Sequence, residues 1–288
     1  MSAKVTIKDV AREAGVSVAT VSYIMNGRSD QSISDKTKKK VLQIANLMNY
    51  VPSHAAKSLA TGRNNVIGLS FSSSSMNSVF VKMIIERLGR LGYDVLYTPS
   101  SQREEDVQVK RNVDAIIAIG LSENEFRSLA ENYMVPVITV DMLVHDDLFY
   151  QLYEDYPSLL VKALEAIGKE ASSVVLVYDS FKNEAYQKFV TECLPFKKVI
   201  STPELTPGTL DEIKKEPVIS IGSIPSLLML PYFAHESFAA ILSDEEFYLL
   251  PDDIKVLKNN ASKKANMTIN ILLNALNRNF DIEHELKV

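Results

Sequence analysis

Lysine and arginine side chains, which bind phosphate groups, are concentrated at the start of this 288-residue chain. Residues 1–63 contain ten Lys or Arg and four Asp or Glu, a local charge of +6, whereas the remaining residues contain 21 and 32, a charge of −11. A basic segment joined to a larger acidic one is typical of a phosphate-binding module on a carrier that nucleic acid repels. On charge alone, a chance cluster of solvated lysines is the alternative.

No grouping of side chains in the sequence points to catalysis or to a metal site. The chain lacks a Gly-rich phosphate loop, a G-x-S-x-G nucleophile motif and a His/Cys set at metal-ligand spacing. Its four histidines, His54, His145, His235 and His284, are scattered, and each is better explained as a surface or packed residue. The single cysteine, Cys193, excludes an intramolecular disulfide, and we expect it only to pack. We therefore expect neither an enzyme nor a bound cofactor or metal.

Apolar spacing at the start of the chain predicts two short helices around a glycine. Residues 6–14 place apolar side chains three and four positions apart behind Thr6 as N-cap, and Gly15 supplies the turn. Ser17 then caps a predicted helix over residues 18–26. Its expected inward-facing residues are Val21, Ile24 and Met25. Two short helices around such a turn form a helix-turn-helix.

A third helix is predicted after Ser34, which serves as its N-cap. Its expected core-facing residues are Val41, Leu42, Ile44, Ala45 and Met48. Lysines occupy positions 36, 38, 39 and 40, where positive charge opposes the helix dipole. That local cost is easier to understand if an anionic partner lies nearby, although lysine runs on helices are usually just solvated faces.

Several sequence blocks occur in a fixed order in the first sixty residues. They are TIKDVAREAGVS at 6–17, ATVS at 19–22, NG at 26–27, NYVP at 49–52 and AKSLA at 56–60. With these blocks, residues 5–69 resemble the headpiece and hinge of the lactose-repressor (LacI/GalR) family of transcriptional regulators. The resemblance implies a helix-turn-helix DNA-binding headpiece (1–50), a hinge helix and linker (51–63), and a periplasmic-binding-protein-like regulatory and dimerisation domain (64–288).

The resemblance also implies roles for individual headpiece residues, with the second helix lying in the major groove of DNA. The implied base-reading residues are Val18, Ala19 and Tyr23. The implied phosphate contacts are Thr6, Ser17, Thr20, Ser22, Asn26 and Tyr50, most of them short side chains that donate to phosphate without reading sequence. Many family members have arginine where Tyr23 stands, so the base preference at that step must differ. Tyr23 packed on the headpiece surface is the alternative.

The segment from residue 53 to residue 60 has a helical pattern but is too short to be stable alone. The resemblance implies that it is the hinge helix, paired with its twin in the minor groove. The implied minor-groove residues are Ala56, Lys57 and Leu59, with Leu59 as an apolar wedge at the central base step. A flexible linker whose Leu59 docks on the following domain is the alternative.

From residue 66 onward, short apolar runs alternate with helical patterns, which predicts α/β structure with parallel sheets flanked by helices. The predicted strands span 66–69, 93–97, 114–119, 135–140, 173–177, 198–200 and 217–221. The predicted helices span 79–90, 123–132, 159–169, 183–192 and 268–277, with one more near residue 104. This pattern resembles, more loosely, the two doubly wound α/β subdomains of periplasmic sugar-binding proteins, with the second subdomain shortened.

In that architecture a ligand lies in a cleft at the carboxyl ends of the strands. The candidate effector-binding residues are Ser72, Ser73, Phe80, Asp141 and Lys182. Asp141 could accept a hydrogen bond from a ligand or merely cap the next segment. The serine run that starts at Ser72 could cradle an anion, although a plain loop is the better reading.

Three polar groups that the family uses in this cleft are missing from the chain. No arginine occurs in 180–184, the Asn-Asp pair is replaced by residues 222–225, and the aspartate turn expected after 254–257 is replaced by Lys258-Asn259-Asn260. A sugar site discriminates through such hydrogen-bonding partners. Their loss argues against a sugar effector.

Taken together, the sequence predicts a DNA-binding transcriptional regulator, most simply a repressor, that binds a pseudo-palindromic operator as a homodimer. A small-molecule or protein effector would act through unequal affinity for the DNA-competent and incompetent states. The alternative keeps the DNA-binding role but has a decayed small-molecule site, so that the regulator is constitutive or controlled by a protein partner.

Two further classes fit less well. An α/β enzyme with an incidental basic start lacks the motifs, and a solute-binding protein would need an export signal that the sequence does not show. No apolar run is long enough to cross a bilayer. We therefore expect a cytoplasmic, nucleoid-associated protein without a membrane partner.

Overall fold

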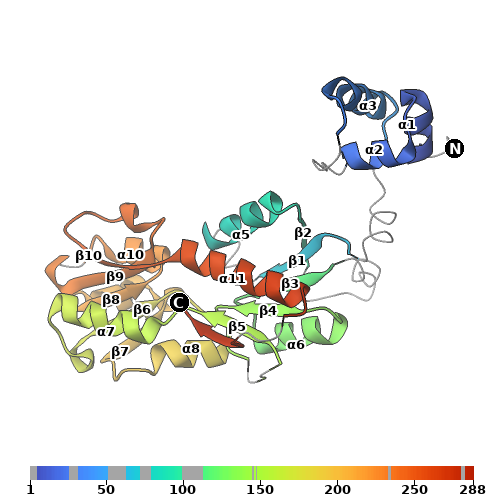
Figure 1. Ribbon diagram of the computed structural model, residues 1–288. Coiled ribbons are helices and arrows are strands. Elements are labelled where there is room, and N and C mark those ends of the chain that lie inside the picture. Colours follow the sequence, from blue (N-terminus) through green and yellow to red (C-terminus); the bar gives the residue numbers. More distant parts are fainter. Residues whose placement is uncertain are drawn as a thin grey trace. The chain divides into compact units, whose positions relative to one another are not determined.

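The computed structural model describes residues 5–25, 32–50, 63–71, 79–98, 113–144, 146, 148–232, 235–279 and 283–288. The chain divides into two compact units, Met1–Asn64 and Asn65–Val288 (Figure 1). This division lies next to residue 64, where the regulatory domain is predicted to begin. The predicted hinge helix lies outside the described residues, and its bounds stay a prediction.

The first unit contains three described helices, α1 Ile7–Ala14, α2 Val18–Met25 and α3 Asp35–Leu47, and α1 contacts both of the others. Its buried core residues are Val10, Ala11, Ala14, Val21, Val41 and Ala45. The prediction that Leu42 joins this core is wrong, because its side chain is 46% exposed. Val41 and Ala45 lie four positions apart and face inward together, and the next residue along the helix is turned by about 100° away from that stripe.

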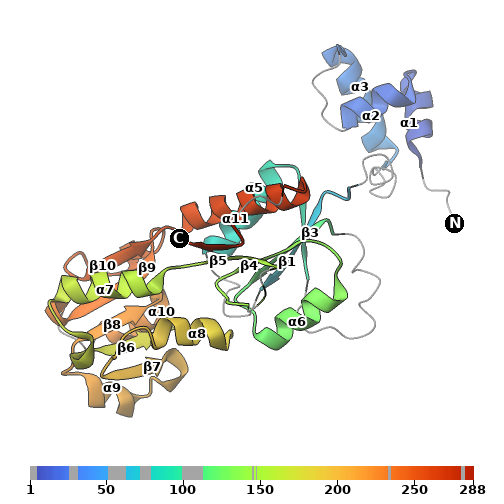
Figure 2. The same ribbon diagram turned by 60° about the horizontal axis from the view of Figure 1, so that its bottom comes forward.

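The second unit contains two parallel sheets (Figures 1 and 2). The first has the strand order β11-β5-β4-β3-β1-β2, and the second has the order β10-β9-β8-β6-β7. The strands of the first sheet are β1 Val66–Phe71, β2 Asp94–Tyr97, β3 Ala115–Ile119, β4 Val137–Val140, β5 Tyr150–Tyr153 and β11 Glu285–Lys287. Those of the second are β6 Val175–Tyr178, β7 Lys198–Ser201, β8 Val218–Ile221, β9 Phe238–Ser243 and β10 Lys255–Asn259.

Helices cover both faces of each sheet. They are α5 Val79–Arg90, α6 Glu123–Asn132, α7 Tyr156–Ile167, α8 Glu184–Thr191, α9 Pro207–Ile213, α10 Ser223–Met229 and α11 Ala261–Leu276, with short 3₁₀ turns η3 Ala171–Ser173, η4 Thr202–Glu204, η5 His235–Ser237 and η6 Phe247–Leu249. In the first sheet, Ala115, Ile117 and Ile119 of β3 pack with α5 and α11, whereas Ile116 and Ala118 pack with α6 (Figure 2). A strand buried on both faces explains why β3 is apolar throughout.

The second sheet is built in the same way. One core cluster joins alternate residues of β6 to α7 and α8, and another joins the intervening residues to α9 and α10. The doubly wound α/β class predicted from the sequence is therefore confirmed for both sheets.

The chain crosses between the two sheets twice. It leaves the first sheet after β5 through Glu154 and Asp155, and it returns after β10 through Asn260 into α11. We call residues 65–153 and 261–288 the first subdomain and residues 156–259 the second. In both views α11 lies beside α5, and Arg87 of α5 donates a hydrogen bond to Asn266 of α11 at 2.8 Å.

Several elements were not predicted. The strand β5 and the helices α9 and α10 are short, β11 is a polar edge strand, and β9, with six residues, was missed as well. The last helix begins at Ala261, seven residues before the predicted start. The prediction began too late because Lys263, Lys264 and Asn266 interrupt the apolar pattern. Asn260 nevertheless caps it by accepting a hydrogen bond from the Lys263 amide at 2.7 Å. None of the helices among the described residues is long and apolar enough to cross a membrane.

Candidate nucleic-acid interface and cleft

The start of α1 is closed by Asp9, whose carboxylate accepts hydrogen bonds from the Thr6 hydroxyl at 2.7 Å and the Thr6 amide at 3.0 Å. These two bonds and the nearby Arg12 guanidinium lower the pKa of Asp9. Gly15 ends the helix with a φ of 64°, a left-handed conformation that favours glycine. The turn between α1 and α2 is thereby set by its own residues.

Ser17 caps α2 as predicted. Its hydroxyl oxygen accepts a hydrogen bond from the Thr20 amide at 3.0 Å and lies 2.8 Å from the Thr20 hydroxyl. The helix therefore begins with two adjacent hydroxyls next to its positive dipole end, an arrangement suited to a phosphate group.

The outward face of α2 carries the residues predicted to read bases. Val18 is 41% exposed, Ala19 is also exposed and Tyr23 is half-buried, whereas Val21 is fully buried. Ala19 and Tyr23 are four positions apart and so share one side of the helix. Val18 and Ala19 are left exposed because α2 packs on the headpiece core through Val21, Ile24 and Met25.

The remaining predicted phosphate contacts are placed less uniformly. Ser22 is half-buried, and Tyr50 packs against the headpiece core, where burial raises its pKa. Asn26 lies outside the described residues, as do the hinge residues Ala56, Lys57 and Leu59. Basic side chains at the start of α3 remain exposed at Lys36, Lys39 and Lys40.

In the second unit, a cavity of about 160 Å³ lies at the carboxyl ends of strands from both sheets. Its lining includes Ile119 at the end of β3, Asp141 after β4, Gly222 after β8, Ser243 at the end of β9 and Asn259 at the end of β10. This position agrees with the general location of ligand sites in open parallel sheets.

The structure brings two of the predicted effector residues together in this cavity, Phe80 and Asp141. Lys182 is not among the lining residues, because it points instead to Glu125, with Nζ 3.2 Å from Oε1. Ser72 and Ser73 lie outside the described residues.

Three cavity features were missed by the sequence reasoning: Lys264, Tyr156 and the neighbouring Glu154. Lys264 sits in the buried stripe of α11, four positions before Thr268 and one before Ala265, and its side chain is only 7% exposed. A lysine in an apolar helical stripe is a signal that could have been noticed, because a buried cation needs a partner.

The ammonium of Lys264 lies between two carboxylates. Its Nζ is 2.8 Å from Asp141 Oδ2 and 3.5 Å from Glu154 Oε2, and the Glu154 side chain is 2% exposed. It also lies 5.0 Å from the centre of the Phe80 ring. Burial alone would lower the pKa of Lys264, but the carboxylates of Asp141 and Glu154 raise it more strongly. Burial raises the pKa of Glu154 to about 7, although Lys264 partly offsets the shift.

Two details concern the polar groups that the family resemblance led us to expect in this cleft, an Asn-Asp pair and an aspartate turn. Gly222 has a φ of 102°, and a Cβ at this position would lie 3.3 Å from Asp179 Cβ, so the site is unfavourable to a longer side chain. An aspartate does follow β9, a strand that was not predicted. This residue, Asp244, accepts a hydrogen bond from the Ala261 amide at 3.1 Å and so helps to cap α11.

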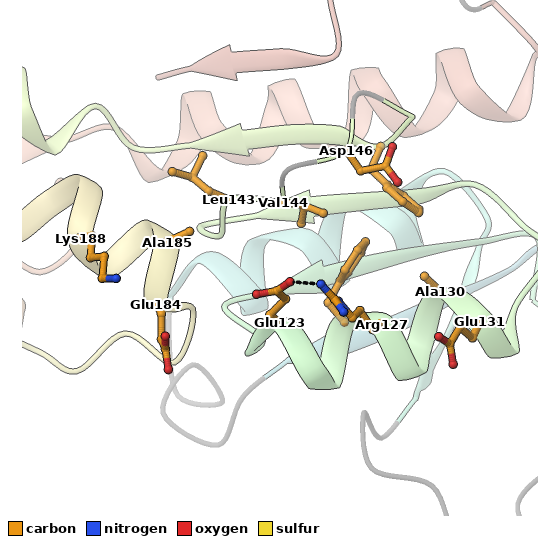
Figure 3. A pocket seen from close by; sticks show the side chains of 12 residues that line it. Glu123, Arg127, Ala130, Glu131, Leu143, Val144, Asp146, Glu184, Ala185 and Lys188 are labelled. Carbon is orange, nitrogen blue, oxygen red and sulfur yellow. Dashed lines mark hydrogen bonds and ion pairs between the residues drawn. The ribbon is translucent and has the colours of Figure 1, made fainter.

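A larger crevice of about 670 Å³ lies between α6, the loop after β4 and the start of α8 (Figure 3). Its apolar lining includes Phe126 and Phe149, whose rings meet edge to face with centroids 4.9 Å apart. Glu123 and Arg127 form an ion pair on α6, and Lys188 lies across from them on α8 (Figure 3). None of the predicted effector residues lines this crevice.

Within the parts of the chain that the structure describes, no three His, Cys, Asp or Glu side chains are grouped to hold a metal ion.

Comparison with known proteins found similarity to bacterial regulators. Residues 6–53 match the model described as "Bacterial regulatory proteins, lacI family". The "Fructose operon regulatory protein" of Vibrio cholerae is 28% identical over 184 residues, 60% of this chain and 56% of the relative. The "HTH-type transcriptional regulator DegA" of Bacillus subtilis is 35% identical over 152 residues, 50% of this chain and 44% of the relative. The chain thus matches about half the length of these relatives, which are regulators and not enzymes.

The fold is shared with a solved lac repressor dimer bound to operator and the anti-inducer ONPF. The TM-score is 0.68 at 18% sequence identity, and the match covers 99% of this chain and 96% of that chain. This likeness extends over both the helical headpiece and the paired parallel sheets.

Proposed function

The chain belongs to the lacI family of bacterial regulatory proteins, and we propose that it represses transcription by binding a pseudo-palindromic operator as a homodimer. The observation that carries this proposal is the matched helix-turn-helix, with α2 exposing Val18 and Ala19 on a face that its own fold leaves open. A helix of this kind fits the major groove. The basic start of the chain supplies the attraction to phosphate, and the acidic remainder limits non-specific binding.

In this proposal, Val18, Ala19 and Tyr23 contact base edges. Tyr23 has no guanidinium fork for a guanine, so it uses its hydroxyl, or its ring against a thymine methyl group. The hydroxyls of Ser17 and Thr20 support a phosphate role through their place at the positive end of α2.

The remaining phosphate contacts are proposed from the family resemblance, at Thr6, Ser22, Asn26 and Tyr50. The same resemblance is the basis for proposing residues 51–63 as hinge and linker, with Leu59 as a minor-groove wedge flanked by Ala56 and Lys57. Inserting a wedge kinks DNA most easily at a pyrimidine-purine step. With these roles, we propose that the protein acts in the cytoplasm, bound to the DNA of the nucleoid.

A homodimer is supported by apolar side chains that the single chain leaves exposed. Ile224, Leu227 and Leu228 of α10 are 56%, 44% and 46% exposed, and Tyr232 just beyond the helix is 48% exposed. A two-fold dimer matches the two half-sites of a palindrome. We therefore propose that α10 contributes to the dimer surface.

A second candidate differs only in its regulation: the DNA-binding role is kept, but the small-molecule site has decayed, and the regulator is constitutive or answers to a protein partner. The size of the cavity at the strand ends favours this version. Its volume of about 160 Å³ is below the roughly 300–1,000 Å³ common for ligand pockets.

Binding-site selection from randomised duplex DNA with the full-length chain, repeated at two salt concentrations, tests the proposal. We expect a pseudo-palindrome with a central pyrimidine-purine step, and binding that weakens with salt. Salt-sensitive binding without any consensus sequence would refute sequence-specific operator recognition. A consensus without two-fold symmetry would refute the dimer.

A further inference from the structure

The cleft of the second unit contains a cation that belongs to the chain itself. Lys264 comes from α11 and is 7% exposed, and its Nζ contacts Asp141 at 2.8 Å and Glu154 at 3.5 Å. Asp141 follows β4 and Glu154 lies in the crossing from the first sheet to the second. One ammonium therefore joins three segments that meet where ligands of parallel sheets usually bind.

We propose that the Lys264 side chain is a built-in ligand, which occupies the cleft in place of a small-molecule effector and leaves the protein unresponsive to neutral sugars. The inference rests on the proposed function only in calling the occupant's place an effector site.

The contacts of the ammonium are those that a bound cation would need. Two carboxylates supply the counter-charge, and the Phe80 ring lies 5.0 Å from Nζ, within the range of a cation–π contact. Phe80 and Asp141 are two of the residues predicted to bind an effector, and both are engaged by Lys264.

A neutral polyol cannot replace these contacts. To bond Asp141 Oδ2 it would have to displace the ammonium, which would then stay buried without its nearest counter-charge, a strongly unfavourable exchange. Asp141 Oδ1 has no hydrogen-bond partner among the described residues, so the exclusion applies to the Oδ2 contact. The remaining cavity of about 160 Å³ is also small for such a molecule. Because Lys264 is covalently attached, its local concentration does not fall when solution ligands are dilute.

Removing the side chain should convert the occupied cleft into a binding site for a free primary ammonium ion. Lys264→Ala removes three methylene groups and the ammonium and keeps Cβ, so we expect it to leave beside Asp141 and Glu154 a space the size of n-propylammonium. The matched control is Lys263→Ala, because Lys263 directly precedes Lys264 on α11, carries the same charge and is exposed.

The experiment measures the thermal unfolding midpoint of the full chain against increasing n-propylammonium, with 1-propanol and glucose as neutral probes. We expect the midpoint of Lys264→Ala to rise with the logarithm of n-propylammonium concentration but not with 1-propanol. Neither the wild type nor Lys263→Ala should respond to n-propylammonium in this way, and no form should respond to glucose.

Equal responses of Lys264→Ala to n-propylammonium and 1-propanol would overturn the proposal, as would saturable glucose binding by the wild type in calorimetry. If Lys264→Ala does not fold alone, the refolded yield is compared with either probe present. A yield restored by n-propylammonium alone supports the built-in ligand, and equal yields refute it.

The triple variant Asp141→Asn/Glu154→Gln/Lys264→Met is a second control, because it removes the charges together. It should fold and lose the response to n-propylammonium, and a retained response would place that response elsewhere and contradict the proposal. All these readouts are independent of DNA, so their failure is distinguishable from a failure of operator binding.

Discussion

Glu154 is nearly inaccessible and shares its cation with Asp141, so one ammonium faces two carboxylates. Burial is the main cause that raises the pKa of Glu154 to about 7, while Lys264 lowers it and the charge of Asp141 raises it further. Near neutral pH, partial protonation of Glu154 brings the net charge of the buried cluster of Lys264, Asp141 and Glu154 closer to zero. The residue thus links proton binding to the stability of the second unit.

The raised pKa of Glu154 predicts a pH dependence of folding. The unfolded side chain loses its proton near the usual pKa of 4.5, but the folded one does so only near 7. Folded protein therefore holds the extra proton between these values, and the free energy of unfolding falls as pH rises through this window, on the order of 1–3 kcal/mol. Urea unfolding at pH 5 and pH 7.5 should show this fall in the wild type and a smaller one in Glu154→Gln.

The exposed Glu165 of α7 provides the control for this comparison. Glu165→Gln should keep the pH profile of the wild type. Parallel profiles for the wild type and Glu154→Gln would contradict the assignment to Glu154.

Tyr23 is the residue at which we expect this headpiece to differ from arginine-bearing relatives in its base preference. Tyr23→Arg should change the selected base at one position of each half-site by about 1–3 kcal/mol of discrimination, because a guanidinium reads guanine through two hydrogen bonds. The measurement is competition binding with single-base operator variants at two salt concentrations. Gln43→Arg, which adds the same charge at an exposed position of α3, should leave the base preference unchanged. A uniform change on all sequences would contradict base reading by Tyr23.

Among the secondary-structure elements, those of the headpiece depend on caps and a turn formed by residues that are close in the sequence. The Asp9 carboxylate closes α1, Gly15 turns the chain, and Ser17 opens α2. Each acts over three or four residues, and together they orient α2 before any distant contact forms. Six buried side chains then complete a small core. Because the free energy of unfolding of such a small unit is low, removing one of these local interactions removes a large fraction of it.

Gly15→Ala is predicted to destabilise the headpiece by about 1–2 kcal/mol, because an L-residue is unfavourable at a φ of 64°. Steric crowding does not contribute, since the nearest atom to a Cβ there is Lys40 Nζ at 3.9 Å. Gly15→Asn should cost less, because asparagine tolerates this conformation. Amide hydrogen exchange of residues in α1 and α2 of the full chain checks the order of the three forms. Equal protection in Gly15→Ala and the wild type would contradict it.

For the whole molecule, the exposed apolar side chains of α10 have the greatest consequence. A monomer with such a surface buries it by association, and two-fold association would also pair the headpieces for a palindrome. The proposed dimer thus connects the second unit to DNA affinity without requiring any ligand.

Leu228→Asp is predicted to shift the full chain from dimer to monomer and to weaken binding to a palindromic operator more than to a single half-site. A charge in the core of an apolar interface is costly because it loses hydration without a partner. Sedimentation velocity measures the mass, and binding to both DNA probes measures the coupling. Val161→Asp on α7, where the side chain is 43% exposed, is the matched control and should remain dimeric. A dimeric Leu228→Asp would remove α10 from the proposed interface.

The headpiece and the α/β alternation could be predicted because their signals are local. Apolar spacing, the caps and the glycine turn located α1, α2 and α3, and α5 and α6 match their predicted ranges. The short elements β5, α9 and α10 could not be found in this way, since they hold too few residues to show a period. The strand β9 is as long as β1, and its apolar run was overlooked. The burial of Leu42 was predicted wrongly because one helical position either side of a stripe is ambiguous from the pattern alone.

The residue types that suit DNA and the order of helices and strands can be read from the sequence, since these depend on neighbours a few positions apart. The occupant of the cleft is set by contacts between distant parts of the chain. Asp141 and Lys264 are 123 positions apart, and they meet because α11 returns to the first subdomain and packs beside α5. No local period encodes such a contact, because it depends on how two distant segments enclose the same space.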